Sequence, residues 1–249
     1  MLRKTLTFGC SLLLSFGMSL SAQSVDELIS KNIQARGGLE KLRAVQSVRL
    51  SGHMSMGGGL EAPFSIQMKR PGMMRFEATI QGKTMVQGFD GETGWQIMPF
   101  MGSNDPEKVP EEEVKQLKEE ADWDGPLVDY KEKGHTVELA GKEDVEGTEA
   151  LKLKVTLKSG DVKYFYLDPE NYLVLKETAK VNREGAEIDM ESYLGNYKQV
   201  DGLMVPFSVD SRAKGQQGGS TMTLDKIEFG VALDEAIFKM PAPAIPAAK

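Results

Sequence analysis

The chain has 249 residues, of which 40% are hydrophobic and 27% are charged, and its formal net charge at pH 7 is −7. This acidic balance disfavours nucleic acid and anionic lipid headgroups as partners. Since the acids are scattered along the chain, we interpret the charge chiefly as a source of solubility.

The first 22 residues have the pattern of a signal peptide. Arg3 and Lys4 precede an apolar run from Leu6 to Leu20, and small residues follow that run. We predict export, with cleavage near Ser21 or Ala22. An uncleaved membrane anchor is the alternative, but Ser, Thr and Gly interrupt the run, and an anchor needs about 20 unbroken apolar residues.

Cleavage would remove Arg3, Lys4 and the single cysteine, Cys10, which changes the net charge from −7 to −9. The mature chain then has neither a disulfide framework nor a thiolate metal site, so its hydrophobic core must suffice. About 225 residues are enough for one large core. We predict a single domain over residues 23–241 and a Pro/Ala tail over residues 242–249.

Two short helices are predicted at the start of the mature chain. Ser24 can cap the first, which ends at the glycine pair 37–38, and the second runs from Leu39 to Val45. Each has a narrow apolar stripe, as expected of a helical cover on a sheet.

A five-strand meander is predicted next, because the hydrophobic period changes to two from Val48 onwards and Gly-containing turns separate the runs. Methionine is frequent on its apolar side. Met adapts to irregular space, so this face suits either an ordinary core or a pocket for flexible acyl chains. The inward positions that we select are Met54, Phe64, Ile66, Met68, Phe76, Met85, Trp95 and Ile97.

A helical insertion follows the meander and makes a plausible lid. Pro110 opens this helix, and residues 111–113 are all glutamates. A metal site is a poor explanation of the acids, because neighbouring helical residues point in different directions and the helix dipole favours acids in a first turn.

A second run of strands contains a hairpin at 161–178, whose turn is Asp-Pro-Glu-Asn. Both faces of this hairpin are apolar, which suggests cover on one side and an apolar space on the other. Tyr164 and Tyr166 carry hydroxyl groups that need partners, so we favour the other set for the interior. That set is Phe165, Leu167, Leu173 and Leu175.

The sequence lacks the patterns of an enzyme. His53 and His135 are the two histidines, and neither belongs to a recognisable arrangement with a nucleophile. No phosphate-binding glycine motif precedes a helix, and no metal-ligand spacing occurs. We therefore predict no catalytic activity, no metal and no cofactor.

The order of elements and three segments resemble the LolA-like superfamily of periplasmic outer-membrane lipoprotein-sorting proteins. The segments are DVKYFYLDPENYLVLKE (161–177), YKQVDGLMVPFSV (197–209) and TMTLDKIEFGVALDEAIFKMP (221–241). The resemblance implies a mainly β (α+β) fold, an incomplete antiparallel β-barrel of about ten or eleven strands. The N-terminal and inserted helices would close it over an apolar cavity for acyl chains, which the twelve selected residues would line.

The resemblance also implies a function: a periplasmic protein that binds lipid or lipoprotein acyl chains and shuttles them towards the outer membrane. Dedicated carriers in this superfamily share an arginine that locks the closed cavity, but Arg49 and Arg75 both fall on the polar side of their strands. The alternative is therefore an envelope sensor or interaction module with a filled interior. We expect a monomer whose partners are acyl chains and a protein at the inner or outer membrane, and no nucleic acid.

Overall fold

The computed structural model describes residues 24–57, 59–102, 104–183, 186–216 and 218–243. The predicted signal peptide lies outside these residues, as do residues 244–249 of the predicted tail. No helix in the described ranges is long and apolar enough to cross a membrane. The helices are α1 (Val25–Ala35), α2 (Leu39–Ala44) and α3 (Glu111–Glu120), with 3-10 turns η1 (Pro99–Met101) and η2 (Glu235–Phe238).

Within the described residues, thirteen strands form one antiparallel sheet, and two more form a separate ribbon. Along the chain they are β1 (Ser47–Met56), β2 (Leu60–Lys69), β3 (Met73–Ile80), β4 (Lys83–Phe89), β5 (Gly94–Ile97), β6 (Glu107–Lys108), β7 (Thr136–Val145), β8 (Thr148–Thr156), β9 (Val162–Leu167), β10 (Val174–Arg183), β11 (Ala186–Gly195), β12 (Lys198–Val200), β13 (Leu203–Val205), β14 (Ser208–Ala213) and β15 (Ser220–Phe229). The ribbon is β12–β13.

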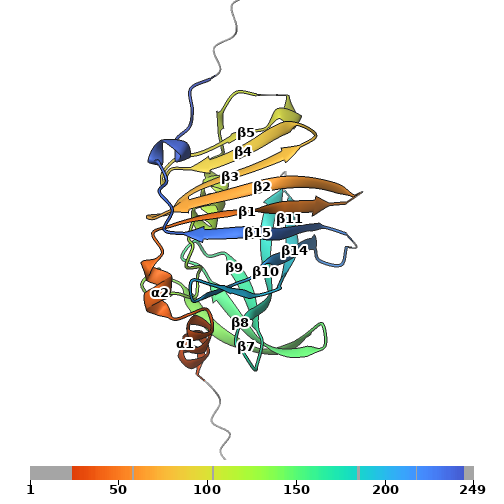
Figure 1. Cartoon of the computed structure of the whole chain (residues 1–249). Coiled ribbons are helices and arrows are strands. Elements are labelled where there is room, and N and C mark those ends of the chain that lie inside the picture. Colours follow the sequence, from red (N-terminus) through yellow and green to blue (C-terminus); the bar gives the residue numbers. More distant parts are fainter. Residues whose placement is uncertain (1–23, 58, 103, 184–185, 217, 244–249) are drawn as a thin grey trace, which may run out of the picture.

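The sheet is an incomplete barrel, as predicted, although it has more strands than the ten or eleven expected. In the part of the chain that the structure describes, its order is β6-β5-β4-β3-β2-β1-β15-β14-β11-β10-β9-β8-β7, so β6 and β7 are edges that do not pair with each other. The meander and the second run of strands meet where β1 pairs with β15, with Val48 opposite Phe229. Figure 1 shows this junction as the orange β1 beside the blue β15.

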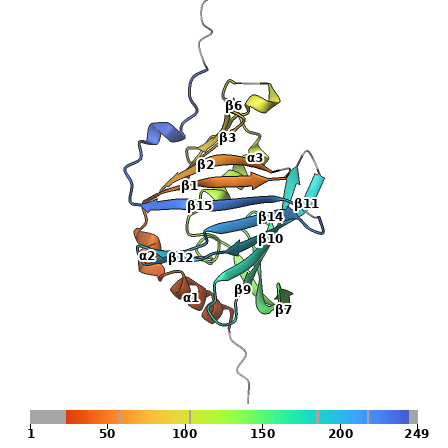
Figure 2. The same cartoon turned by 45° about the vertical axis from the view of Figure 1, so that its right-hand side comes forward.

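One face of the sheet, which we call the inner face, is covered by the helices. Leu28 and Ile29 of α1 join an apolar cluster with β8 and β9, and Leu42 of α2 joins one with β1 and β15. Leu117 of α3 packs with β3 and β4. Figure 2 shows α3 behind β1 and β2, with α1 and α2 further along the sheet. Each fully buried Leu contributes about 1.5–3 kcal/mol, so the cover is held mainly by apolar contact.

Local sequence explains where α1 begins and ends. The Ser24 hydroxyl accepts a hydrogen bond from the Glu27 amide at 3.2 Å, which confirms the predicted cap. Gly37 follows the helix with a φ of 117°, and a Cβ there would lie 2.4 Å from the carbonyl oxygen of Gly202. Only glycine fits this position, because both the backbone angle and the close approach of the β12–β13 turn exclude a side chain.

The predicted hairpin is confirmed as β9 and β10. Asp168 shapes the turn, since its carboxylate accepts hydrogen bonds from the amides of Glu170 and Asn171 at 2.7 and 3.3 Å. Phe165 and Leu167 face inward and pack with the α1 cluster. The helical cover and the interior therefore lie on the same side of the hairpin, not on opposite sides as its two apolar faces suggested.

The outer face of the hairpin is covered by charged side chains. Tyr166 lies on this face, and the ammonium groups of Lys152 and Lys176 lie 5.3 and 5.0 Å from its ring centroid. Lys176 is itself buried and forms an ion pair with Glu191 at 2.8 Å. The apolar stems of the two lysines thus cover Tyr166. Their positive charges are compensated by Glu143, which pairs with Lys152, and by Glu191, which pairs with Lys176.

Candidate functional site

Eight of the twelve selected residues lie on the inner face. Strand pairing places the selected residues of the meander on the same face, with Ile66 opposite Phe76 and Met85 opposite Ala78. Phe64 is buried, whereas Met54, Phe76 and Met85 are half-buried, so part of this apolar surface is reachable from outside. The eight are Met54, Phe64, Ile66, Met68, Phe76, Met85, Phe165 and Leu167.

Trp95 and Ile97 lie on the outer face, which corrects their assignment to the interior. A Cβ on Gly94 would lie 2.6 Å from Val109 and 2.7 Å from Leu117, so Gly94 occupies the inward position beneath α3. Its neighbour Trp95 consequently points outward. There the Trp95 indole N–H donates to the carbonyl oxygen of Phe238 at 2.7 Å, and the C-terminal turn η2 buries the ring completely.

Leu173 and Leu175 do not join Phe165 and Leu167 at the inner face. Leu175 packs with Val145, Ala150 and Tyr166 in the outer cluster. A register irregularity in β10 between Val174 and Lys176 explains this placement, because an irregular step breaks strict alternation. Leu173 belongs to the turn, where its carbonyl oxygen accepts a hydrogen bond from the amide of Asp168.

A cavity of about 720 Å³ lies where α3 and the segment 121–135 meet one end of the sheet. Its volume is within the range of about 300–1,000 Å³ typical of small-molecule sites. Met68 is the one selected residue among those that line it. Apolar lining comes from Val48, Met68, Phe89, Ala121, Trp123 and Leu157, and ionisable groups from Lys69, Arg70, Lys115, Lys118, Glu119, Asp122, Lys133, His135 and Lys158.

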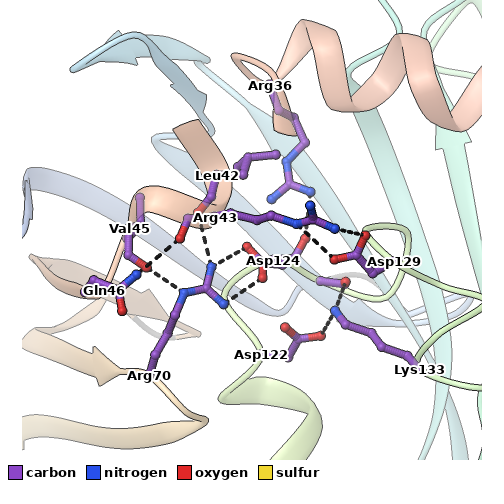
Figure 3. A network of polar contacts seen from close by, with 11 residues as sticks. Arg36, Leu42, Arg43, Val45, Gln46, Arg70, Asp122, Asp124, Asp129 and Lys133 are labelled. Carbon is purple, nitrogen blue, oxygen red and sulfur yellow. Dashed lines mark hydrogen bonds and ion pairs between the residues drawn. The ribbon is translucent and has the colours of Figure 1, made fainter. Parts of the chain in front are cut away.

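Arg70 joins the cover to the sheet at the edge of this cavity (Figure 3). Its guanidinium donates to the carbonyl oxygens of Val45 at 2.6 Å and Leu42 at 3.1 Å, beside the end of α2. It also binds both carboxylate oxygens of Asp124, at 2.8 and 2.7 Å. This ion pair raises the pKa of Arg70 further, so the guanidinium stays charged.

A second arginine and a lysine support the same segment (Figure 3). Arg36, at the end of α1, donates to the carbonyl oxygen of Asp124 at 2.8 Å. Lys133 binds the carboxylate of Asp122 and donates to the carbonyl oxygen of Gly125 at 2.8 Å. Arg70 directly follows β2, where alternation no longer predicts the direction of a side chain, so the sequence pattern pointed to Arg49 and Arg75 and not to Arg70.

The interior also contains charged groups away from Arg70. Lys163 on β9 forms an ion pair with Glu119 of α3 at 2.7 Å, which fixes the helix over the sheet. Glu177 lies on the inner face, opposite Phe165. Burial raises the pKa of the Glu177 carboxyl, while the positive charge of Lys163 opposes the shift.

Replacing Glu177 with glutamine is expected to stabilise the protein at neutral pH. Because folding raises the pKa of Glu177, this group favours the folded state below its ordinary pKa, and that contribution is lost as pH rises through the raised value. The variant should therefore have a higher Tm than the wild type at about pH 7 and a similar or lower Tm near pH 3. Thermal unfolding across that range measures the difference, with Glu61→Gln on the outer face as control. A gain in Tm that does not change with pH would contradict the assignment.

Three solved structures are similar to this chain. A DUF1329 family protein from Desulfovibrio piger gives a TM-score of 0.59 at 13% identity and covers 86% of this chain and 97% of its own. A domain assigned as an outer-membrane lipoprotein-sorting protein from Vibrio parahaemolyticus gives 0.55 at 10% identity, covering 86% and 95%. A LolA superfamily protein from Nitrosomonas europaea gives 0.54 at 13% identity, covering 88% and 98%.

The chain has the LolA-like fold. No family model matches the sequence, and no curated protein matches it either. At 10–13% identity the likeness concerns the fold, so function has to be argued from this chain's own interior. That interior has a half-buried apolar face and a cavity lined by both apolar and ionisable side chains.

Proposed function

We propose that this protein is exported to the periplasm, where it binds lipid or lipoprotein acyl chains in its half-barrel and shuttles them towards the outer membrane. The observation that carries the proposal is the cavity of about 720 Å³ between the helical cover and the sheet. The proposal takes residues 1–22 as a signal peptide and residues 23–241 as one domain. It assigns the protein a binding role without catalysis.

The chemistry of the inner face supports acyl chains as the ligand. Met54, Phe76 and Met85 are half-buried there, on the same face of the sheet as the buried Phe64. Flexible Met side chains adapt to chains of different length, and transfer from water is favourable by about 0.8 kcal/mol for each buried CH₂. The alternative, a sensor or interaction module with a filled interior, is not supported by a cavity of this volume.

Native mass spectrometry of protein purified from its host tests the proposal. We expect co-purifying species with the masses of lipids or acylated proteins, and displacement of a fluorescent fatty-acid probe by extracted lipid. Repeated absence of any acyl ligand, together with no uptake of the probe, would overturn the proposal.

Replacing Phe76 with aspartate is expected to weaken uptake of the probe about tenfold or more, because a carboxylate would then face the apolar interior. Phe76 does not line the cavity, but it is half-buried on the inner face opposite Ile66 and stacks near Phe64, with ring centroids 6.3 Å apart. The variant therefore tests whether the acyl chain extends from the cavity onto this face. Thr79→Asp is the matched control. It introduces the same charge on the outer face of the same strand, where Thr79 pairs with Thr84. Equal effects of the two variants in folded protein would disprove the assignment of faces.

A further inference from the structure

The cavity combines an apolar floor with an excess of positive charge, although the whole chain is acidic. Six cationic and two anionic side chains line it, in addition to His135. The net charge of the chain is −7, so this local surplus opposes the overall balance. A surplus of one sign around a low-dielectric cleft attracts ligands of the opposite sign.

Three of the six cations already have partners. Lys69 forms an ion pair with Glu235 at 2.9 Å, Arg70 binds Asp124, and Lys133 binds Asp122. The two lining acids are likewise occupied, since Asp122 binds Lys133 and Glu119 binds Lys163 at 2.7 Å. Within each pair the two charges offset each other, so neither is available to a ligand.

Lys115, Lys118 and Lys158 are different. All three are exposed and line the cavity, and none has an ion pair or side-chain hydrogen bond with the described residues. Lys115 and Lys118 are three residues apart on α3 and therefore share one side of the helix. Lys158 comes from the turn between β8 and β9, so the cations approach the cavity from two different elements.

We propose that the cavity takes an anionic lipid, with its acyl chain against Val48, Met68 and Leu157 and its phosphate or carboxylate group among Lys115, Lys118 and Lys158. The inference rests on the proposed acyl-chain binding and adds the class of headgroup. The acidic balance of the whole chain disfavoured anionic lipid headgroups, and this proposal reverses that expectation. Positive charges grouped at the cavity act on a bound ligand more strongly than distant acids, whose effect is screened by salt.

His135 offers an internal reporter of the headgroup. Its Nδ1 accepts a hydrogen bond from the amide of Lys158 at 3.0 Å, and the residue lines the cavity. Burial and the charge of Lys133 lower the pKa of His135 in the free protein. An anion bound beside Lys158 should raise that pKa, whereas the ring signals of His53, which lies near Asp225 outside the cavity, should not move.

The test compares lysophosphatidylglycerol with lysophosphatidylcholine of the same acyl chain, and both with inorganic phosphate. Isothermal titration below the critical micelle concentration measures affinity, and NMR follows His135. We expect the wild type to prefer the anionic lipid about tenfold, and the preference to fall as salt is raised, because the three lysines are exposed.

The variant Lys115→Gln, Lys118→Gln, Lys158→Gln should lose that preference while it still binds lysophosphatidylcholine. Gln has nearly the helix propensity of Lys, and the three side chains are exposed, so the fold should be kept. The control is Lys108→Gln, Lys214→Gln, Lys239→Gln, which removes three exposed lysines outside the cavity and should leave the preference unchanged.

Each remaining outcome contradicts a different claim. Equal affinity of the wild type for the two lipids would overturn the headgroup assignment and leave acyl-chain binding intact. Binding of neither lipid would overturn the proposed function as well. Inorganic phosphate that binds as tightly as the anionic lipid would identify a site for a free anion and overturn the lipid assignment.

Discussion

Replacing Arg70 with glutamine is expected to lower the free energy of unfolding by about 2–4 kcal/mol and the Tm by about 5–15 °C. The variant would lose the bonds to the carbonyl oxygens of Val45 and Leu42 and would leave the carboxylate of Asp124 without its cation. The Asp124 side chain is 8% exposed, and an unpaired charge at such a site is costly. Chemical denaturation with a far-UV signal measures the change.

Arg43→Gln is the matched control for this prediction. Arg43 binds Asp129 at 2.6 Å, as short as the 2.7 Å contact of Arg70 with Asp124, but its side chain is 56% exposed compared with 30% for Arg70. Since exposed pairs contribute at most about 1 kcal/mol, the control should change stability little. Adding Asp124→Asn to Arg70→Gln should restore part of the loss, because the uncompensated charge is then removed. Similar small losses for the two arginine variants would show that burial does not distinguish the pairs.

Features set by neighbouring residues could be predicted from the sequence. The Ser24 cap, the hairpin turn at Asp168 and the helix after Pro110 each depend on contacts within a few positions, and alternation assigned the inward faces of β1 to β4. The fold class followed from the order of these elements and from the resemblance.

Features set by distant segments could not be predicted. Arg70 and its partner Asp124 are 54 positions apart, and neither belongs to a pattern that identifies the other. The cavity is lined by strand ends, turns and one side of α3, which alternation does not describe, so Met68 was the one lining residue in the selected set. Leu175 was misplaced for a related reason, because a single irregular step in β10 reverses the direction of a side chain.

Trp95 shows how a third segment decides which way a strand faces. The sequence of β5, Gly-Trp-Gln-Ile, allows either Trp95 and Ile97 or Gly94 and Gln96 to point inward. The interior was predicted for Trp95 because its side chain is large and hydrophobic. Two contacts reverse that choice. Val109 and Leu117 leave room for nothing larger than Gly94 on the inner face, and η2 supplies Phe238 as cover and as hydrogen-bond acceptor on the outer face. A side chain that seemed suited to a ligand therefore stabilises the attachment of the C-terminal segment.

Replacing Trp95 with alanine should consequently lower the free energy of unfolding by about 3–5 kcal/mol without changing lipid affinity. The ring is fully buried, and its removal leaves both a void and an unpaired carbonyl oxygen at Phe238. Trp123→Ala is the comparison, because Trp123 is half-buried and lines the cavity, so this variant should alter uptake of a fatty-acid probe. Denaturation curves and probe titrations well below each Tm separate the two effects. If Trp95→Ala changed probe affinity while stability stayed near that of the wild type, the ring would have to face the ligand, and the outer-face assignment of β5 would be wrong.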